Sequence, residues 1–437
     1  MMDIKIHARM RNWALIVCLL FLQACASTTT IQTARMQYFS GQPDRALETL
    51  NAANPDSKNR LLVDFDRGSI AFAAGRYRES SRALLQASST LAQLDFISVS
   101  EQSTALVTND WATSYRGEYS ERLWVHSLQM MNFLLLNEPE SAAVEARQAI
   151  RLLGTHAKAL KKDWFTRALI GISLEEVKQF DSAHIEYNKL FTDADYSEGI
   201  ARLAWNNAKR LDRRTAMKKI ASGRNFKPFD SAIVVFVDTG RIATKHVGSI
   251  PIDIDQFIAF PIYPEYPEIS KAINVSLNGK EVSSTPITTN LISVARSSLS
   301  KRGNKIALKS VVRAGVKNAI AKEARKEDTL LGMFVTAALY ISELPDTRSW
   351  ETLPGQLSML VIPVKPGTHS VSVEVGSGSS SRVVTLDDIN VQRGQRVFRT
   401  LNNPTPLTPA LTPALTPALA PQTTPVPADT PVSAATS

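Results

Sequence analysis

A 34-residue spacing near the N-terminus limits the folds that this 437-residue chain can adopt. Four positions of the first interval recur 34 residues later: Gly41, Ala46, Leu50 and Ala53 correspond to Gly75, Ser80, Leu84 and Ala87. A period of this length accommodates two helices with their turns, and small residues at the recurring positions let the helices approach closely. The pattern therefore predicts stacked helix pairs.

Later intervals extend the pattern. A single offset aligns Gly171, Leu174, Phe180, Ala183, Tyr187 and Leu190 with Gly68, Ala71, Tyr77, Ser80, Leu84 and Ala87, and a less regular pair contains Met130, Phe133, Ala142, Ala146 and Ala149. The period is that of tetratricopeptide (TPR) helix pairs, so we predict a TPR-like helical repeat domain over residues 25–211, interrupted at 88–121 and closed by a helix at 200–211. A generic antiparallel α-bundle stays open as the alternative, because strict repeats are few.

Strand periodicity follows a basic stretch that ends at Arg224. Residues 231–237 and 273–282 are rich in Val and Ile, and Asn278-Gly279 between apolar flanks predicts a hairpin. Further strands are expected at 357–364, 369–375, 382–386 and 396–401, with a long helical insert at 290–342. The fold class is thus α+β multidomain: the repeat domain, then a β-rich domain over 225–401 forming an antiparallel sheet or sandwich.

The two ends of the chain carry different signals. Lys5, Arg9 and Arg11 precede an apolar run that ends in Leu22-Gln23-Ala24-Cys25, the arrangement of a bacterial lipoprotein signal peptide over residues 1–24. We expect Cys25 to be lipidated, and Ala26 after it implies sorting to the outer membrane; an N-terminal anchor helix is the alternative. Residues 402–437 repeat Thr, Pro, Ala and Leu, which predicts a disordered tail.

The formal net charge of +9 favours an acidic neighbour such as lipid phosphate or cell-wall polymer, and no feature favours nucleic acid. In the insert, basic residues recur at every fourth position, as Lys301, Lys305, Lys309, Arg313 and Lys317. This ridge predicts either the solvated face of a core-packed helix or a basic amphipathic helix on an anionic surface.

Motifs for catalysis are missing from the sequence. The histidines show neither zinc-site nor metalloprotease spacing, and neither a phosphate-binding glycine loop nor a nucleophile elbow occurs. We therefore predict that the chain is not an enzyme and binds no metal or cofactor.

Two clusters combine aromatic and charged side chains. The first contains Asn109, Asp110, Trp111, Tyr115, Gly117, Glu118, Tyr119 and Glu121, and the second contains Asp346, Arg348 and Trp350. With residues 143–147 and the signal-peptide motif, they resemble a family of poorly characterised TPR-containing lipoproteins of Gram-negative bacteria, over most of residues 25–401. Some members are encoded near lipoproteins that activate penicillin-binding proteins, so the resemblance implies an envelope role. In the alternative interpretation these residues only stabilise the fold: Asp346 pairs with Arg348 across a turn, and Trp350 is buried in the core.

The favoured hypothesis is an outer-membrane lipoprotein that faces the periplasm and acts as a protein-binding adaptor, with both clusters as candidate partner-binding residues and the concave repeat surface as the gripping face. A competing hypothesis places a wall-modifying site around Asp346, Arg348 and His369, which burial of Arg348 and Trp350 would contradict. A third has the basic ridge bind peptidoglycan or lipid phosphate.

Overall fold

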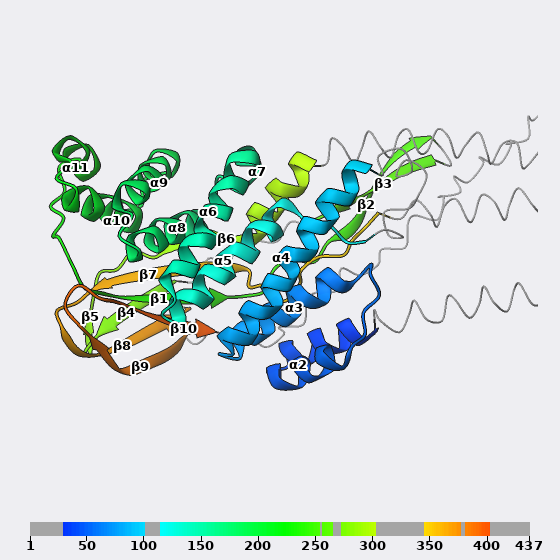
Figure 1. Cartoon of the computed structure of the whole chain (residues 1–437), viewed down its shortest axis with the longest axis horizontal. Coiled ribbons are helices and arrows are strands. Elements are labelled where there is room, and N and C mark those ends of the chain that lie inside the picture. The colour runs from blue at the N-terminus through cyan, green and yellow to red at the C-terminus, as the bar shows by residue number, and fades with distance from the viewer. Residues whose placement is uncertain are drawn as a thin grey trace, which may run out of the picture.

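The computed structural model describes residues 29–100, 114–253, 256–264, 272–302, 345–376 and 381–402. These residues form five helix pairs followed by three β-sheets (Figure 1). The expected signal peptide with Cys25, most of the helical insert and residues 403–437 of the tail lie outside the described residues.

In each pair, one helix faces the strands and the other faces away from them. The inner helices are residues 29–39, α3 (Arg60–Ala73), α5 (Tyr119–Leu135), α8 (Trp164–Glu176) and α10 (Glu198–Arg210). The outer helices are α2 (Pro43–Ala52), α4 (Tyr77–Ser100), α6 (Pro139–Thr155), α9 (Phe180–Asp193) and α11 (Arg214–Ala221), and the short α7 (Ala157–Leu160) follows α6. The fifth pair continues the repeat beyond residue 211, where the sequence predicts its end.

One turn geometry recurs in all five pairs. The residue two positions before each outer helix has a positive φ angle, between 49° and 77°, at Gly41, Gly75, Asn137, Lys178 and Asp212. The amide after each of them donates to a carbonyl five residues back, as from Gln42 to Gln37 and from Arg213 to Ala208. This is the Schellman closure of a helix end. Five equivalent turns establish a TPR-like repeat and exclude an irregular bundle.

The helices of a pair cross where a small residue meets a large one. A Cβ atom added to Gly68 would lie 2.6 Å from Leu84 Cδ2, and one added to Gly171 would lie 2.3 Å from Tyr187 Cε1. The equivalent positions of the first pair hold Ala34 and Leu50, both fully buried. At each of these crossings a residue no larger than Ala on the inner helix makes room for a large residue on the outer helix.

The strands form a sandwich beside the inner helices. The inner sheet has the order β10-β1-β7-β6, from β1 (Ala232–Thr239), β6 (Ile287–Asn290), β7 (Gln356–Pro363) and β10 (Arg396–Asn402). The outer sheet has the order β5-β4-β8-β9, from β4 (Ile273–Leu277), β5 (Lys280–Glu281), β8 (Gly367–Val375) and β9 (Arg382–Val391). A separate hairpin of β2 (His246–Asp253) and β3 (Gln256–Ile262) extends away from the sandwich (Figure 1).

The predicted strands are present, but β2, β3 and β6 were not predicted, and the connections of the strands differ in two ways. Asn278 and Gly279 adopt φ angles of 50° and 75° in the turn that pairs β4 with β5, as a two-residue hairpin requires. However, β1 pairs with β10 in parallel, so the inner sheet is mixed rather than antiparallel. The turn at residues 364–366 joins β7 to β8 but carries the chain from the inner sheet to the outer one.

The inner sheet is the middle of three layers. Along β1, Val234 and Phe236 join the hydrophobic cluster of the helices, whereas Ile233, Val235 and Val237 join the cluster between the two sheets. All eight residues of β1 are buried. The sheet thus covers the inner-helix face, which the sequence predicts to be free for a partner.

The burial of the helices agrees with this layering. Eleven of the thirteen residues of α8 are buried, against four of the fourteen in its outer partner α9. Twelve of seventeen are buried in α5, against five of seventeen in α6. The inner helices therefore pack on both sides, and the outer helices keep one face in solvent.

We expect Gly171→Ala to destabilise the chain by about 1–3 kcal/mol, because its Cβ would overlap the ring of Tyr187. The control is Gly154→Ala in α6, where an added Cβ has no heavy atom within 4 Å. This substitution should raise the free energy of unfolding by about 0.5–1 kcal/mol. Urea unfolding measures both. The double variant Gly171→Ala/Tyr187→Leu reproduces the Ala34 and Leu50 pair and should recover most of the loss; no recovery would contradict this account of the crossing.

Candidate functional site

The second sequence cluster lies at the boundary between the helices and the strands, in the segment of residues 345–355 that leads into β7. The Trp350 ring stacks on Phe65 of α3, with ring centroids 4.4 Å apart and planes inclined by 17°. Its Nε1 donates to Ser69 Oγ at 3.0 Å, and the side chain is fully buried. Trp350 thus fills the space over α3, as the alternative interpretation predicts.

A buried ion pair lies beside Trp350. Arg35 Nε donates to Asp66 Oδ2 at 2.7 Å, and Arg35 also pairs with Glu351 at 2.8 Å. Asp66 is fully buried and also accepts from Thr352 Oγ1 at 2.8 Å. Burial raises the pKa of Asp66 from its ordinary value and Arg35 opposes that rise. These contacts join the first two repeats to the 345–355 segment.

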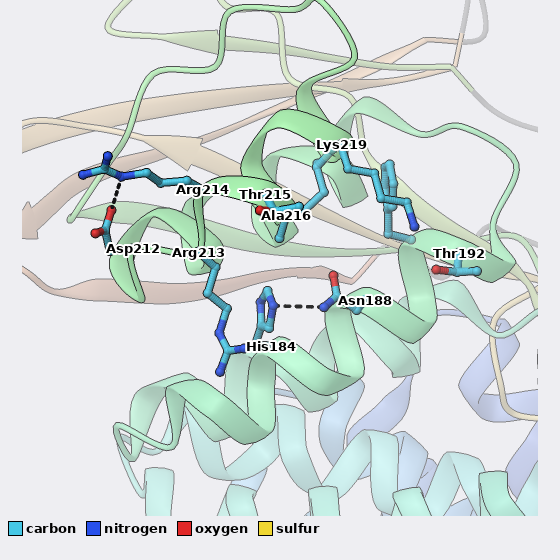
Figure 2. Close-up of a pocket in the computed structure, with 11 residues that line it drawn as sticks. His184, Asn188, Thr192, Asp212, Arg213, Arg214, Thr215, Ala216 and Lys219 are labelled. Atoms are coloured by element: carbon cyan, nitrogen blue, oxygen red, sulfur yellow. Dashed lines mark hydrogen bonds and ion pairs between the residues drawn. The ribbon is translucent and has the colours of Figure 1, made fainter.

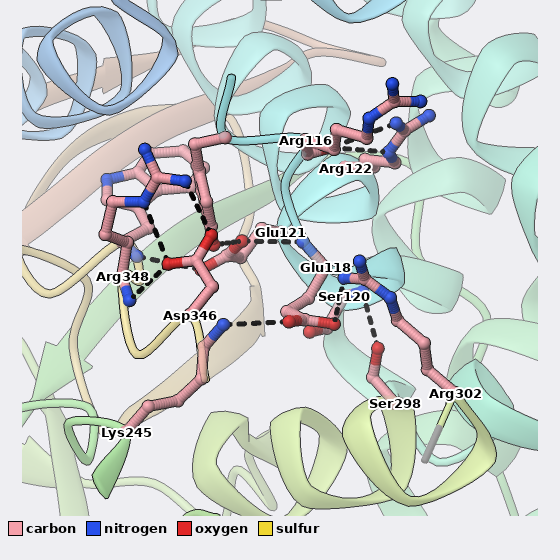
Figure 3. A network of polar contacts seen from close by, with 12 residues as sticks. Arg116, Glu118, Ser120, Glu121, Arg122, Lys245, Ser298, Arg302, Asp346 and Arg348 are labelled. Carbon is pink, nitrogen blue, oxygen red and sulfur yellow. Dashed lines mark hydrogen bonds and ion pairs between the residues drawn. The ribbon is translucent and has the colours of Figure 1, made fainter. Parts of the chain in front are cut away.

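The first cluster forms the adjoining part of the same boundary, at the N-terminus of α5 (Figure 3). One carboxylate, Glu121, accepts from the Glu118 amide at 2.7 Å, from the Trp350 amide at 2.8 Å and from the Tyr115 hydroxyl. Because these donors come from both clusters, a single side chain holds the start of α5 against the 345–355 segment.

Glu118 forms the second part of this network, in which its carboxylate pairs with two cations. Its Oε1 accepts from Lys245 Nζ at 2.8 Å, and its Oε2 accepts from Arg302 Nη1 at 3.1 Å. The side chains of Glu118 and Lys245 are 3% and 1% exposed. Burial alone would raise the pKa of Glu118, but the two cations outweigh it and lower the pKa to about 2. The carboxylate therefore stays charged at neutral pH.

Two further polar links tie the later repeats to the inner sheet. Asp163 begins α8, is fully buried, and accepts from Trp124 Nε1 at 2.9 Å and from Thr289 Oγ1 of β6 at 3.1 Å. Arg396 of β10 pairs with Glu176 at 2.9 Å and with Glu175. Polar contacts thus follow the boundary from the first repeat to the fourth.

The other residues of the two clusters have less central positions. Arg348 Nη2 pairs with Asp346 Oδ2 at 2.7 Å, and Arg348 Nη1 donates to the Lys58 carbonyl at 3.0 Å. The pairing of Asp346 with Arg348 across a turn is therefore confirmed. Tyr119 stacks on His156 at 3.7 Å, and Asn109, Asp110 and Trp111 lie outside the described residues.

The described contacts of both clusters are internal. Tyr115, Glu118, Arg348 and Trp350 are each at most 9% exposed. Their polar atoms serve the packing of helices against strands, so a direct contribution of these side chains to partner binding stays a prediction. What the arrangement does is fix the two parts of the chain in one relative position.

The wall-modifying site expected around Asp346, Arg348 and His369 loses its support. Arg348 and Trp350 are buried at the helix boundary. His369 belongs to β8 of the outer sheet, where its ring contacts Asn278 and the Lys365 carbonyl. The Asp346–Arg348 pair and His369 therefore have separate surroundings rather than a shared cleft.

The remaining candidate site residues, those of the basic ridge and the lipidation site, lie mostly outside the described ranges. Lys301 is exposed on the helix at residues 291–302, and Lys305, Lys309, Arg313, Lys317 and Cys25 are not described. Within the described ranges, no group of His, Cys, Asp or Glu could hold a metal ion. The helices of those ranges include none that is both long and apolar enough to cross a bilayer.

Several residues of the boundary were missed by the sequence analysis, above all Asp66, Asp163, Glu175 and Lys245. A signal for the helical ones was present: Asp66 follows Phe65 in α3, and Glu175 follows Leu174 in α8, inside helices that are apolar on several sides. A carboxylate in such a helix indicates a buried partner. Lys245 carries no comparable signal in its neighbours.

No protein-family model matches the chain, and no curated protein matches it. Similar solved structures include one from the functional characterisation of Pseudomonas aeruginosa PilF, at 17% identity over 45% of this chain and 74% of that chain, with a TM-score of 0.31. MamA from AMB-1 is 11% identical over 46% and 92%, with a TM-score of 0.33. YrrB, described as a TPR protein with an unusual peptide-binding site, is 14% identical over 44% and 81%, with a TM-score of 0.30.

These similarities are too low to carry an argument about function. The TPR-like assignment rests on the 34-residue interval between the starts of α2 and α4, at residues 43 and 77, and of α8 and α10, at residues 164 and 198. The five equivalent turns support it.

We expect Glu118→Gln to cost about 3–5 kcal/mol at pH 7, because it leaves Lys245 buried without its counter-charge. The pKa of Glu118 is lower in the folded chain than in the unfolded one. Its contribution to the free energy of unfolding is therefore complete above the ordinary pKa of 4.5 and is lost as the pH falls towards 2. The difference between wild type and variant in urea unfolding should therefore shrink between pH 5 and pH 2.5.

The control for this experiment is Glu198→Gln, which breaks the partly exposed pair with Arg202 and should lower the free energy of unfolding by less than about 1 kcal/mol. Equal losses for both variants, or a gap that widens in acid, would contradict the assigned role of Glu118.

Proposed function

We propose that this chain is a lipid-anchored scaffold of the bacterial outer membrane, facing the periplasm and binding an envelope protein through its outer helices. The observation that carries the proposal is the one-sided burial of the repeat: the inner helices are covered by the chain's own sheet, and the outer helices keep a solvent face. A partner therefore has access to the outer face and not to the inner one.

Apolar side chains on the outer helices support this assignment. Leu85 of α4, Val144 of α6 and Ile185 of α9 are 47%, 50% and 54% exposed. Single exposed apolar residues are common, but these three recur on successive outer helices of one repeat array. They suit a partner protein that offers apolar side chains of its own.

The proposed location in the cell envelope is supported by the sequence alone. Lipidation of Cys25 would anchor the chain, and the likeness to TPR-containing Gram-negative lipoproteins favours an envelope partner. Contact of the basic ridge with anionic lipid or peptidoglycan would add a second attachment, and Lys301 is its described, exposed member.

Cys25→Ser should release the protein from the membrane fraction and abolish incorporation of labelled palmitate, because no thiol remains for the acyl-glycerol. Cell fractionation and autoradiography measure the two effects, with Cys18→Ser as the matched control that keeps both. A Cys25→Ser variant that fractionates like wild type would refute the lipid anchor.

Capture after crosslinking in cells tests the binding surface. Val144→Glu and Ile185→Glu together should lower the yield of the captured partner at least about fivefold, because two charges replace apolar contacts. The control is Val383→Glu on β9, where the side chain is 60% exposed but lies on the outer sheet. If only the β9 control lost capture, the binding surface would lie on the sandwich and not on the helices.

A further inference from the structure

A groove between the last two outer helices has a chemistry that the scaffold role does not yet use. It lies between α9 and α11, has a volume of about 800 Å³, and is lined by residues that include Asn188, Phe191, Thr192, Arg214, Lys219 and Ile220 (Figure 2). Both helices are outer helices, so the groove belongs to the face that the proposed scaffold presents.

Positive charge is concentrated at this end of the repeat. Residues 209–224 contain seven basic residues and one acidic residue, Asp212. Arg214 and Lys219 are exposed at the groove; Arg214 pairs with Asp212 at 3.5 Å, and Arg213, which also lines the groove, pairs with Asp181 at 2.7 Å. Among the described residues, Lys219 has no ion-pair partner within 4.0 Å. The cations of the groove exceed the carboxylates that could neutralise them.

The start of α11 adds donors to these cations. No side chain caps this helix, and the amides of its first turn include those of Thr215 and Ala216, both of which line the groove. Uncapped first-turn amides, together with the helix dipole, favour a negative group. Lys219 and the start of α11 therefore both line the groove, whereas the side chain of Arg214 extends towards Asp212 (Figure 2).

The floor of the groove is uncharged and partly apolar. His184 is buried, its Nε2 contacts the Asn188 side chain at 3.0 Å, and its Nδ1 has no hydrogen-bond partner among the described residues. Burial and Arg213 lower the pKa of His184, so the ring is neutral at pH 7. Phe191 and Ile220 supply apolar wall. A cationic rim over such a floor matches a peptide with acidic and apolar side chains better than a bare anion.

We propose that the groove between α9 and α11 binds a short acidic segment of the partner protein, with its carboxylates on Lys219, Arg214 and the start of α11 and an apolar side chain against Phe191. This inference rests on the proposed scaffold function and names the chemistry of its partner. Charge complementarity selects the occupant, since the groove's exposed charges are predominantly positive.

Fluorescence anisotropy with the purified full chain tests the proposal. The probe is a short fluorescein-labelled peptide of Glu and Leu, and its matched control has Gln in place of Glu. The Glu peptide should bind roughly tenfold more tightly and weaken as salt is raised. Equal affinity for the two peptides would overturn the proposal, as would binding to phosphatidylglycerol vesicles without any binding of the peptide.

Charge reversal assigns binding to the groove. Arg214→Glu/Lys219→Glu should weaken the Glu peptide roughly tenfold and gain affinity for a peptide of Lys and Leu. The control, Lys158→Glu/Lys162→Glu, makes the same change of net charge on exposed residues outside the groove and should leave affinity unchanged. Circular dichroism checks the fold, and equal losses in both double variants would reduce the effect to overall charge and overturn the proposal.

The same variants separate this inference from the scaffold function. If Arg214→Glu/Lys219→Glu still captures the crosslinked partner as well as wild type, the scaffold stands and the groove assignment fails. If neither the variant nor wild type captures a partner while the Glu peptide binds the wild-type groove, the peptide site stands and the scaffold fails.

Discussion

Both faces of strand β1 are buried, and this double burial joins the helical repeat to the sandwich. Phe236 lies between Phe165 of α8 and Phe398 of β10, with ring centroids 6.0 and 6.1 Å away, while Val235 faces the outer sheet. Each large apolar side chain buried in this way contributes about 1.5–3 kcal/mol. Separating the helices from the strands would expose these side chains together, so the chain behaves as one body where its sequence indicates two domains.

The buried charges at this boundary contribute specificity more than stability. An apolar interface alone tolerates sliding, whereas Asp66, Glu118 and Glu175 must each meet a particular cation when they lose water. A shift of one helical turn would leave these carboxylates unpaired in a low-dielectric interior. The apolar core therefore supplies the attraction, and the ion pairs select one alignment of repeat and sheet.

The local parts of the fold could be predicted from the sequence, because they depend on short-range rules. The Gly171 and Tyr187 crossing follows from the alignment of these residues with Gly68 and Leu84, and the β4–β5 hairpin follows from Asn278-Gly279. The covered inner face could not be predicted, since it depends on β10 pairing with a strand far away in the chain. A hint was present in α8, where Leu169, Ile170 and Ile172 leave no polar side for solvent. The clusters expected to bind a partner were detectable as polar and aromatic side chains, but their burial depends on the same long-range packing.

The parallel pairing of β1 with β10 also sets the order in which the molecule can be completed. Ala232 pairs with Arg396, which leaves the ribosome 164 residues later. Until then the nascent inner helices lack the edge of the sheet that covers them, and apolar side chains such as Phe236, which stacks on Phe398 of β10, stay accessible to water. Contacts between such distant segments form slowly, and exposed apolar surface in the meantime favours aggregation. The late arrival of β10 therefore exposes this chain to aggregation until the strand has been inserted.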